Sequence, residues 1–290
     1  MNEHRISHFL DKAQYCEDHQ LWLEAAQYYQ RLIAEAPETL EFHLRLAAVY
    51  GEMGNVHAAE RVLLKLLAMD APKQDVLLAL GTLFYKHEDL DKALFYFEQL
   101  VPFRVPQAHV TMGVIAYRRG DYVTSERHFA RAQELDPAGA GIRLLHAEVL
   151  ITIGRPEQAE KMLRKHAKEQ PADWKALHLL GIAHGAQHDW ERAVLAFAAA
   201  LRAQPDDIDL LCASAGALMQ LRRISDAEQQ LRAAYQLSPD APAVLNSLGA
   251  LALLKADREK AITFFSKALE IDPTNVVALE HVRLLSSTGR

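Results

Sequence analysis

Two histidines, His184 and His188, stand four residues apart, the spacing at which two side chains of one helix can bind the same zinc ion. Asp189 follows directly, and His178 precedes them by a turn and a half of helix. A zinc site needs three or four ligands on a rigid frame. Residues 185–189 interrupt the helical pattern, so His188 falls in a turn. We therefore expect a structural role for these histidines, with no metal and no cofactor.

The two cysteines could support nucleophilic catalysis only if a base were held beside the thiol. The repeated pattern described below places no histidine or aspartate in that role for Cys16 or Cys212. The glycines form no phosphate-binding loop, because G-x-x-x-x-G-K-[ST] is absent and no strand pattern follows residues 139–141. The sequence therefore predicts a protein that is not an enzyme.

The elements that position these residues come from a pattern with a spacing of 34 residues. Small residues recur at position 8 of the pattern: Ala13, Ala47, Gly81, Gly113, Ala147, Gly181, Ala215 and Gly249. Small residues also recur at position 20: Ala25, Ala59, Ala93, Ser125, Ala159, Ala193, Ala227 and Ala261. Large residues recur at position 24: Tyr29, Leu63, Phe97, Phe129, Leu163, Phe197, Leu231 and Phe265. A fixed period of this length predicts stacked repeats.

The copy over residues 174–207 shows the plan of one repeat. Leu177 and Gly181 lie on one face of a first helix by their 3.6-residue spacing, and Ala193 and Phe197 define the inward face of a second helix. Small residues at the crossing let the two backbones approach closely, and the large residue fills the space beside them. Each repeat is therefore expected to be a pair of antiparallel helices.

The pattern resembles that of the tetratricopeptide repeat family, W-x2-L-G-x2-Y, then A-x3-F, then P, over about residues 6–275. The resemblance implies an all-α fold, a right-handed superhelical solenoid of antiparallel helix pairs that forms one unit over residues 1–290. The expected repeats and closing capping helix are 6–39, 40–73, 74–105, 106–139, 140–173, 174–207, 208–241, 242–275 and 276–286. In that family repeat position 11 is normally a core aromatic, which favours burial of His184 and Cys16.

The third repeat departs from the pattern, because it has only 32 residues, with Pro102 near its end and Pro106 directly after it. Proline removes a backbone donor and disrupts a helix interior. We therefore expect its second helix to end early.

The resemblance implies a concave groove lined by the first helices, with positions 2, 5, 9, 12 and 13 facing it. Many residues at these positions are apolar. About half are expected to pack against the next repeat, and the others to form a partner site. The candidate groove residues are Leu44, Leu78, Thr82, Tyr85, Lys86, Val110, Val114, Tyr117, Arg118, Leu144, Ile151, Ile182 and Met219.

Tyr85 and Tyr117 share position 12 in adjacent repeats, beside Lys86 and Arg118. Tyrosine gives a large contact area at low entropy cost, so the group suits a partner with an apolar and an acidic anchor. An ordinary solvated helix end is the alternative. Some relatives clamp chaperone carboxylates with Lys at position 5 and Asn at position 9. No repeat has that pair, which disfavours such a client.

The net charge of −6 argues against a general nucleic-acid binder, which needs clustered Lys and Arg, so no nucleic-acid partner is expected. Residues 1–139 hold 14 basic and 20 acidic residues, whereas residues 140–290 hold 18 of each, so a basic partner is expected at the first half.

Residues 1–5 precede no apolar signal core, no apolar run is long enough to span a membrane, and the two cysteines make no disulfide framework. We expect a cytoplasmic protein without membrane insertion.

The leading hypothesis is a protein–protein interaction scaffold or adaptor that holds a client peptide or helix in its groove. The alanine-rich composition and short turns suggest an assembly factor of a bacterial secretion, pilus or envelope system. The alternative is the substrate-selecting repeat domain of a larger enzyme, such as a repeat-fused glycosyltransferase. A closing helix before a short tail favours a complete protein. The client and the oligomeric state stay open.

Overall fold

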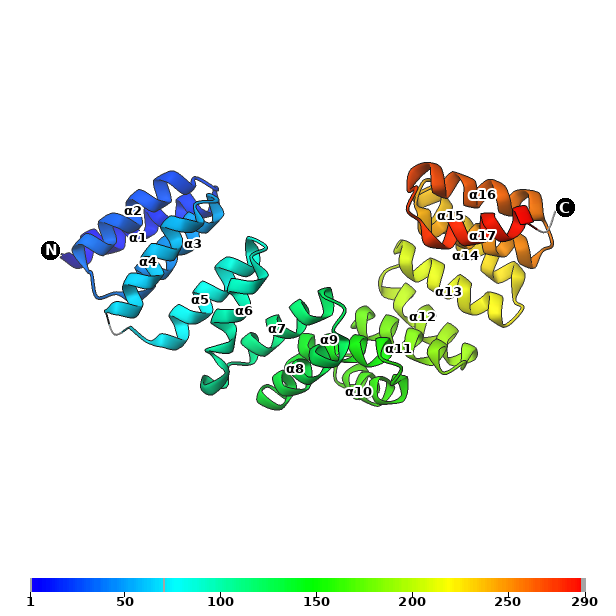
Figure 1. Ribbon diagram of the computed structural model, residues 1–290, viewed down its shortest axis with the longest axis horizontal. Coiled ribbons are helices and arrows are strands. Elements are labelled where there is room, and N and C mark those ends of the chain that lie inside the picture. Colours follow the sequence, from blue (N-terminus) through cyan, green and yellow to red (C-terminus); the bar gives the residue numbers. More distant parts are fainter. Residues whose placement is uncertain (1, 70, 288–290) are drawn as a thin grey trace. The chain divides into compact units, whose positions relative to one another are not determined.

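The computed structural model describes residues 2–69 and 71–287, and these residues form helices, turns and loops with no β-strand (Figure 1). The all-α fold class and the tandem helix pairs are therefore confirmed. The chain divides into two compact units, Met1–Ala138 and Gly139–Arg290. The expectation of one continuous solenoid stays a prediction.

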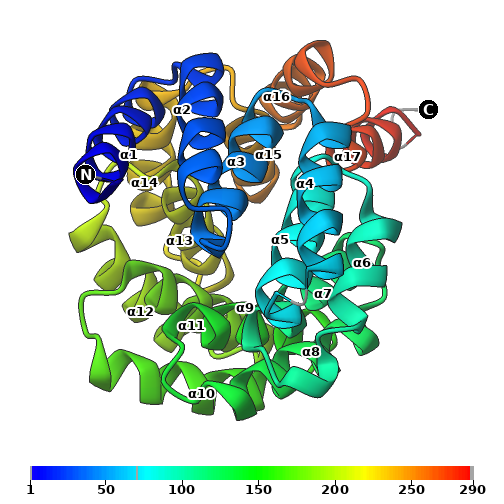
Figure 2. The same ribbon diagram turned by 90° about the vertical axis from the view of Figure 1, so that its left-hand side faces the viewer.

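The first unit holds four helix pairs and one short 3-10 turn within the described residues. Figure 2 shows α2, α3, α4 and α5 side by side. The elements are α1 (Asn2–Asp18), α2 (Trp22–Glu35), α3 (Leu40–Glu52), α4 (Val56–Ala68), α5 (Lys73–Lys86), α6 (Leu90–Glu98), η1 (Val101–Phe103), α7 (Pro106–Arg118) and α8 (Tyr122–Leu135).

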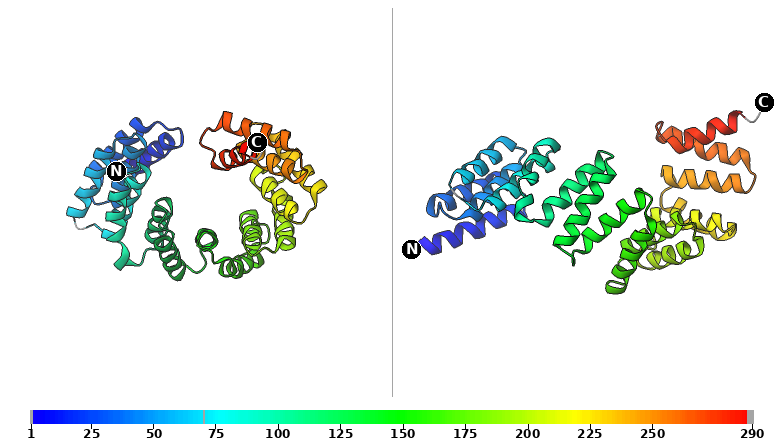
Figure 3. Two further views of the ribbon diagram at one scale, coloured as in Figure 1. Left: turned by 45° about the vertical axis from the view of Figure 1, so that its right-hand side comes forward. Right: turned by 60° about the horizontal axis from the view of Figure 1, so that its bottom comes forward.

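Over residues 139–287, the second unit holds four further pairs and a last helix, coloured green to red in Figures 1 and 3. The first helices begin at the first residue of the expected repeats from 140 onward, because the period sets where each pair restarts. The elements are α9 (Ala140–Thr152), α10 (Pro156–Glu169), α11 (Trp174–Ala186), α12 (Trp190–Ala203), α13 (Ile208–Gln220), α14 (Ile224–Leu237), α15 (Pro242–Leu254), α16 (Arg258–Ile271) and α17 (Val276–Ser287).

The core of each repeat forms where position 8 meets position 24. A Cβ atom added to Gly181 would lie 2.5 Å from the ring of Phe197, so the ring occupies the space that a side chain at position 8 would need. Glycine at position 8 always accompanies phenylalanine at position 24, and alanine accompanies leucine except in the first repeat. The pairs are Gly81/Phe97, Gly113/Phe129, Gly181/Phe197, Gly249/Phe265, Ala47/Leu63, Ala147/Leu163, Ala215/Leu231 and Ala13/Tyr29. The two positions thus share one packing volume, as a close-packed interior requires.

The turn inside each repeat has a left-handed residue at position 15. Three of these residues are glycines and five carry a side chain: Gly54, Gly120, Gly154, Gln20, Glu88, His188, Arg222 and Ala256. In five repeats the next residue is an aspartate or asparagine whose side chain accepts a hydrogen bond from the backbone N–H three residues later. His188, with φ of 59°, therefore serves the turn, as the sequence predicted.

The irregular third repeat has the predicted short second helix. Helix α6 ends at Glu98, and η1 with Arg104 in the left-handed region at φ 57° connects it to α7. Leu100 and Val105 are buried on either side of this connection. Pro102 thus lies just beyond the early end of α6, Pro106 is the first residue of α7, and the residues between the two helices keep contact with the core.

Candidate functional site

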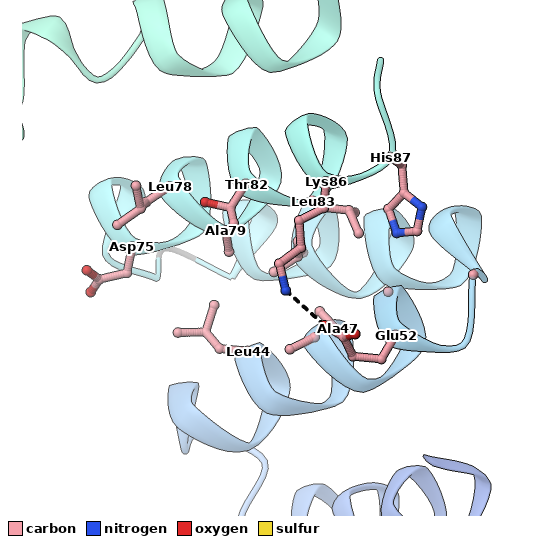
Figure 4. A pocket seen from close by; sticks show the side chains of 14 residues that line it. Leu44, Ala47, Glu52, Asp75, Leu78, Ala79, Thr82, Leu83, Lys86 and His87 are labelled. Atoms are coloured by element: carbon pink, nitrogen blue, oxygen red, sulfur yellow. Dashed lines mark hydrogen bonds and ion pairs between the residues drawn. The ribbon is translucent and has the colours of Figure 1, made fainter. Parts of the chain in front are cut away.

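A pocket of about 680 Å³ lies between α3 and α5, the first helices of the second and third repeats (Figure 4). Four candidate groove residues line it: Leu44, Leu78, Thr82 and Lys86. Its volume is in the range of about 300–1,000 Å³ typical of ligand sites. The structure therefore brings these four residues together on one concave surface.

Small side chains create the space. Leu44 on α3 and Leu78 on α5 occupy repeat position 5 and are half-buried. The side chains of Ala47, Ala48 and Ala79 are too small to fill the space between these two leucines. Most of the lining is aliphatic, so a client side chain that enters would exchange water for apolar surface.

The polar rim of the pocket is partly neutralised. The ammonium of Lys86 donates to Glu52 Oε1 at 2.8 Å, which links the third repeat to the second. Asp75, Glu52 and His87 also line the pocket and are exposed. These three residues were not predicted as groove residues from the sequence. Position 2 for Asp75 and position 13 for Glu52 were the available signals.

The tyrosine pair lies outside this pocket lining. The guanidinium of Arg118 sits over the Tyr85 ring, 5.3 Å from its centroid, and donates to the Glu88 carboxylate at 3.2 Å. Tyr117 packs edge-on against Tyr122, with ring centroids 5.2 Å apart. Tyr85 and Tyr117 are both half-buried, so each offers a client only part of its ring.

The other candidate groove residues differ in exposure. Val110 and Val114 on α7, and Leu144 and Ile151 on α9, are half-buried. Ile182 is exposed on α11. Met219 is only 9% exposed and packs in a core cluster with Ala215 and Leu218, so its side chain serves the core, which does not fit a groove contact.

The histidines and cysteines show structural surroundings. Among residues 2–69 and 71–287, no group of three His, Cys, Asp or Glu side chains is placed to hold a metal ion. His184 is buried with Nδ1 3.9 Å from Glu160, and burial lowers its pKa. Cys16 is buried and Cys212 half-buried, and burial raises the pKa of both thiols, which disfavours the reactive thiolate.

Four half-buried or buried histidines make stability depend on pH. Burial lowers the pKa of His109, His128, His178 and His184, and the Nδ1 atoms of His109 and His128 lie 3.2 Å apart. The unfolded chain binds protons below about pH 6.5, where the folded chain resists them. The melting temperature should therefore fall as pH drops from about 6.5 to 5.

Thermal melts between about pH 6.5 and 5 check this expectation. Carboxylates with lowered pKa values change charge mainly below this range, so they contribute little to the change in melting temperature. The double variant His109→Gln/His128→Gln should lose less stability than the parent over the same interval. A melting temperature that is flat or rises toward acid pH would contradict the assignment.

Repeated antiparallel pairs with a pocket between successive first helices define a helical-repeat protein of the interaction-scaffold class. Models of the tetratricopeptide repeat match residues 44–109, 116–180 and 212–276. The chain belongs to the tetratricopeptide repeat family.

Curated relatives share short stretches with this chain. Human Protein O-mannosyl-transferase TMTC1 is 25% identical over 178 residues, which cover 60% of this chain and 20% of that protein. The TPR repeat-containing protein PA4667 of Pseudomonas aeruginosa is 25% identical over 203 residues, covering 69% of this chain and 34% of PA4667. The chain thus spans about a third or less of the length of these relatives.

Solved structures show the same fold. The Cut9–Hcn1 complex of APC/C superposes with a TM-score of 0.62 at 17% identity, covering 96% of this chain and 55% of that chain. Pseudomonas aeruginosa pilF gives 0.58 at 17% identity, covering 72% of this chain and 96% of that one. Within the described residues, no helix has the length and apolar character to cross a membrane.

Proposed function

We propose that this chain is a non-enzymatic scaffold that holds a peptide or helix of a client protein in the pocket between α3 and α5. The pocket itself carries the proposal, because its aliphatic lining is open to a partner and spans two successive repeats. Burying one or two client side chains there supplies affinity at about 25 cal/mol per Å², less the cost of ordering. A cytoplasmic location is part of the proposal and is supported by two free cysteines.

A second candidate is the substrate-selecting part of a larger enzyme. The partial match to Protein O-mannosyl-transferase TMTC1 favours it, since the matched stretch covers only 20% of that protein. The length of the full reading frame distinguishes the two candidates. A role in bacterial secretion, pilus or envelope assembly is a further proposal, and the likeness to pilF supports only its fold.

Charged substitutions in the pocket test the client site. The parent chain and the variant Leu44→Glu/Leu78→Glu are each immobilised, and proteins retained only by the parent are identified by mass spectrometry. Peptides of these proteins are then titrated against the parent and the variant. The variant should weaken binding about 30-fold or more, as expected for two central apolar contacts. Leu23→Glu/Leu195→Glu is the matched control, because these leucines are 58% and 70% exposed on second helices. Equal retention by parent and pocket variant would reject the site.

Tyr85→Ala/Tyr117→Ala asks whether the client extends beyond the pocket toward α7. The double variant should weaken binding of the identified peptide while the helical circular dichroism stays unchanged, because both rings are partly exposed. Titration of the same peptide measures the effect. An unchanged affinity would confine the client to the pocket between α3 and α5.

A further inference from the structure

The charges around the pocket are unequally compensated. Lys86 is paired with Glu52 at 2.8 Å. Arg45 on α3 is not part of the pocket lining and lies 3.4 Å from Glu17. Asp75 lines the pocket, is exposed, and has no cation within ion-pair distance in the described part of the chain. One negative charge of the pocket is therefore left for a partner.

The position of Asp75 ties this charge to the apolar floor. Figure 4 shows Asp75 next to Leu78 and across from Leu44 at one end of the pocket, while Lys86 and Glu52 form their ion pair further along. A client side chain seated on Leu44 and Leu78 thus has its neighbouring residues close to the Asp75 carboxylate. An acidic neighbour would face repulsion, and it could reach Lys86 only by displacing Glu52.

We propose that the pocket selects a client segment in which an apolar side chain is flanked by a lysine or arginine that faces Asp75. The inference rests on the proposed client site and adds its charge specificity. The sequence favoured an acidic anchor at Lys86 and Arg118, but both cations already face carboxylates of this chain. The excess of acidic residues in the first half agrees with a basic client.

Short random peptides displayed on phage and selected on the parent protein provide the probe. Each enriched peptide is resynthesised with its flanking basic residue replaced by glutamate, and both forms are titrated at low salt. The basic form should bind about threefold to tenfold more tightly, because the glutamate form loses an exposed charge pair and adds a repulsion of similar size. Asp75→Asn should bring this ratio close to one, and Asp75→Lys should invert it.

Glu98→Gln is the matched control, since it removes one exposed negative charge from α6 outside the pocket lining and should leave the ratio unchanged. The inference is overturned if enriched peptides compete for the pocket, as shown by loss of binding to Leu44→Glu/Leu78→Glu, yet carry no basic residue or show the same ratio with Asp75→Asn. In that case the client site stands. If no enriched peptide depends on Leu44 and Leu78, the client site and its charge specificity fall together.

Discussion

Ala193→Leu is expected to lower the free energy of unfolding by about 1–3 kcal/mol or more, because it overpacks a helix crossing. Ala193 has no exposed surface and packs in one cluster with Phe197, Ala200 and Leu210. The longer side chain can enter only by displacing α12 from α11 or α13. Since neighbouring repeats stabilise one another, the loss should spread beyond this repeat.

Denaturant unfolding followed by circular dichroism measures the loss. Gln170→Leu is the control, because Gln170 is exposed after α10 and the same enlargement meets solvent there. The control should stay within about 0.5 kcal/mol of the parent. Equal stability of both variants and the parent would contradict the packing described for position 20.

Gly181→Ala is expected to destabilise the fold by about 1–3 kcal/mol although alanine is the better helix former. The added Cβ atom would lie 2.5 Å from the Phe197 ring, which other buried side chains hold in place. Gly216 in α13 is the matched control, since an added Cβ has no neighbour within 4 Å. Gly216→Ala should instead gain about 0.5–1 kcal/mol.

The pairing of positions 8 and 24 gives a sharper test through a double variant. Gly181→Ala/Phe197→Leu recreates the Ala/Leu pair of three other repeats. The loss of unfolding free energy in the double variant should therefore be smaller than the sum of the two single losses by about 1 kcal/mol or more. Purely additive losses would mean that the two positions do not share one packing volume.

The repeat pattern predicted most of the fold, because the start, the crossing and the end of each helix pair depend on residues within one repeat. The 34-residue spacing predicted where the helices begin, and the small residues predicted where paired helices cross. Pro102 predicted the early end of α6. The division at Ala138 was not predicted, because the period continues across it and the change of net charge near residue 139 was interpreted only as a preference for a basic partner.

The candidate site was harder to predict, because repeat position gives the direction of a side chain but not its neighbours. Leu44 and Leu78 line the pocket as their register indicates, whereas Met219 at position 12 is drawn into the core. The ion pairs Lys86–Glu52 and Arg118–Glu88 join residues from different repeats. Such contacts depend on how repeats stack and leave no signal within one repeat.

The left-handed residues at position 15 show which turns of this chain could be stabilised by substitution. Five turns keep a side chain where three use glycine, and each such residue stores about 1 kcal/mol of strain. Arg222→Gly and Ala256→Gly would place at these turns the residue that Gly54, Gly120 and Gly154 supply in other repeats. The two substitutions would release that strain, and neither residue lines the pocket. Thermostability in this molecule is thus open to engineering by internal consensus, one turn at a time.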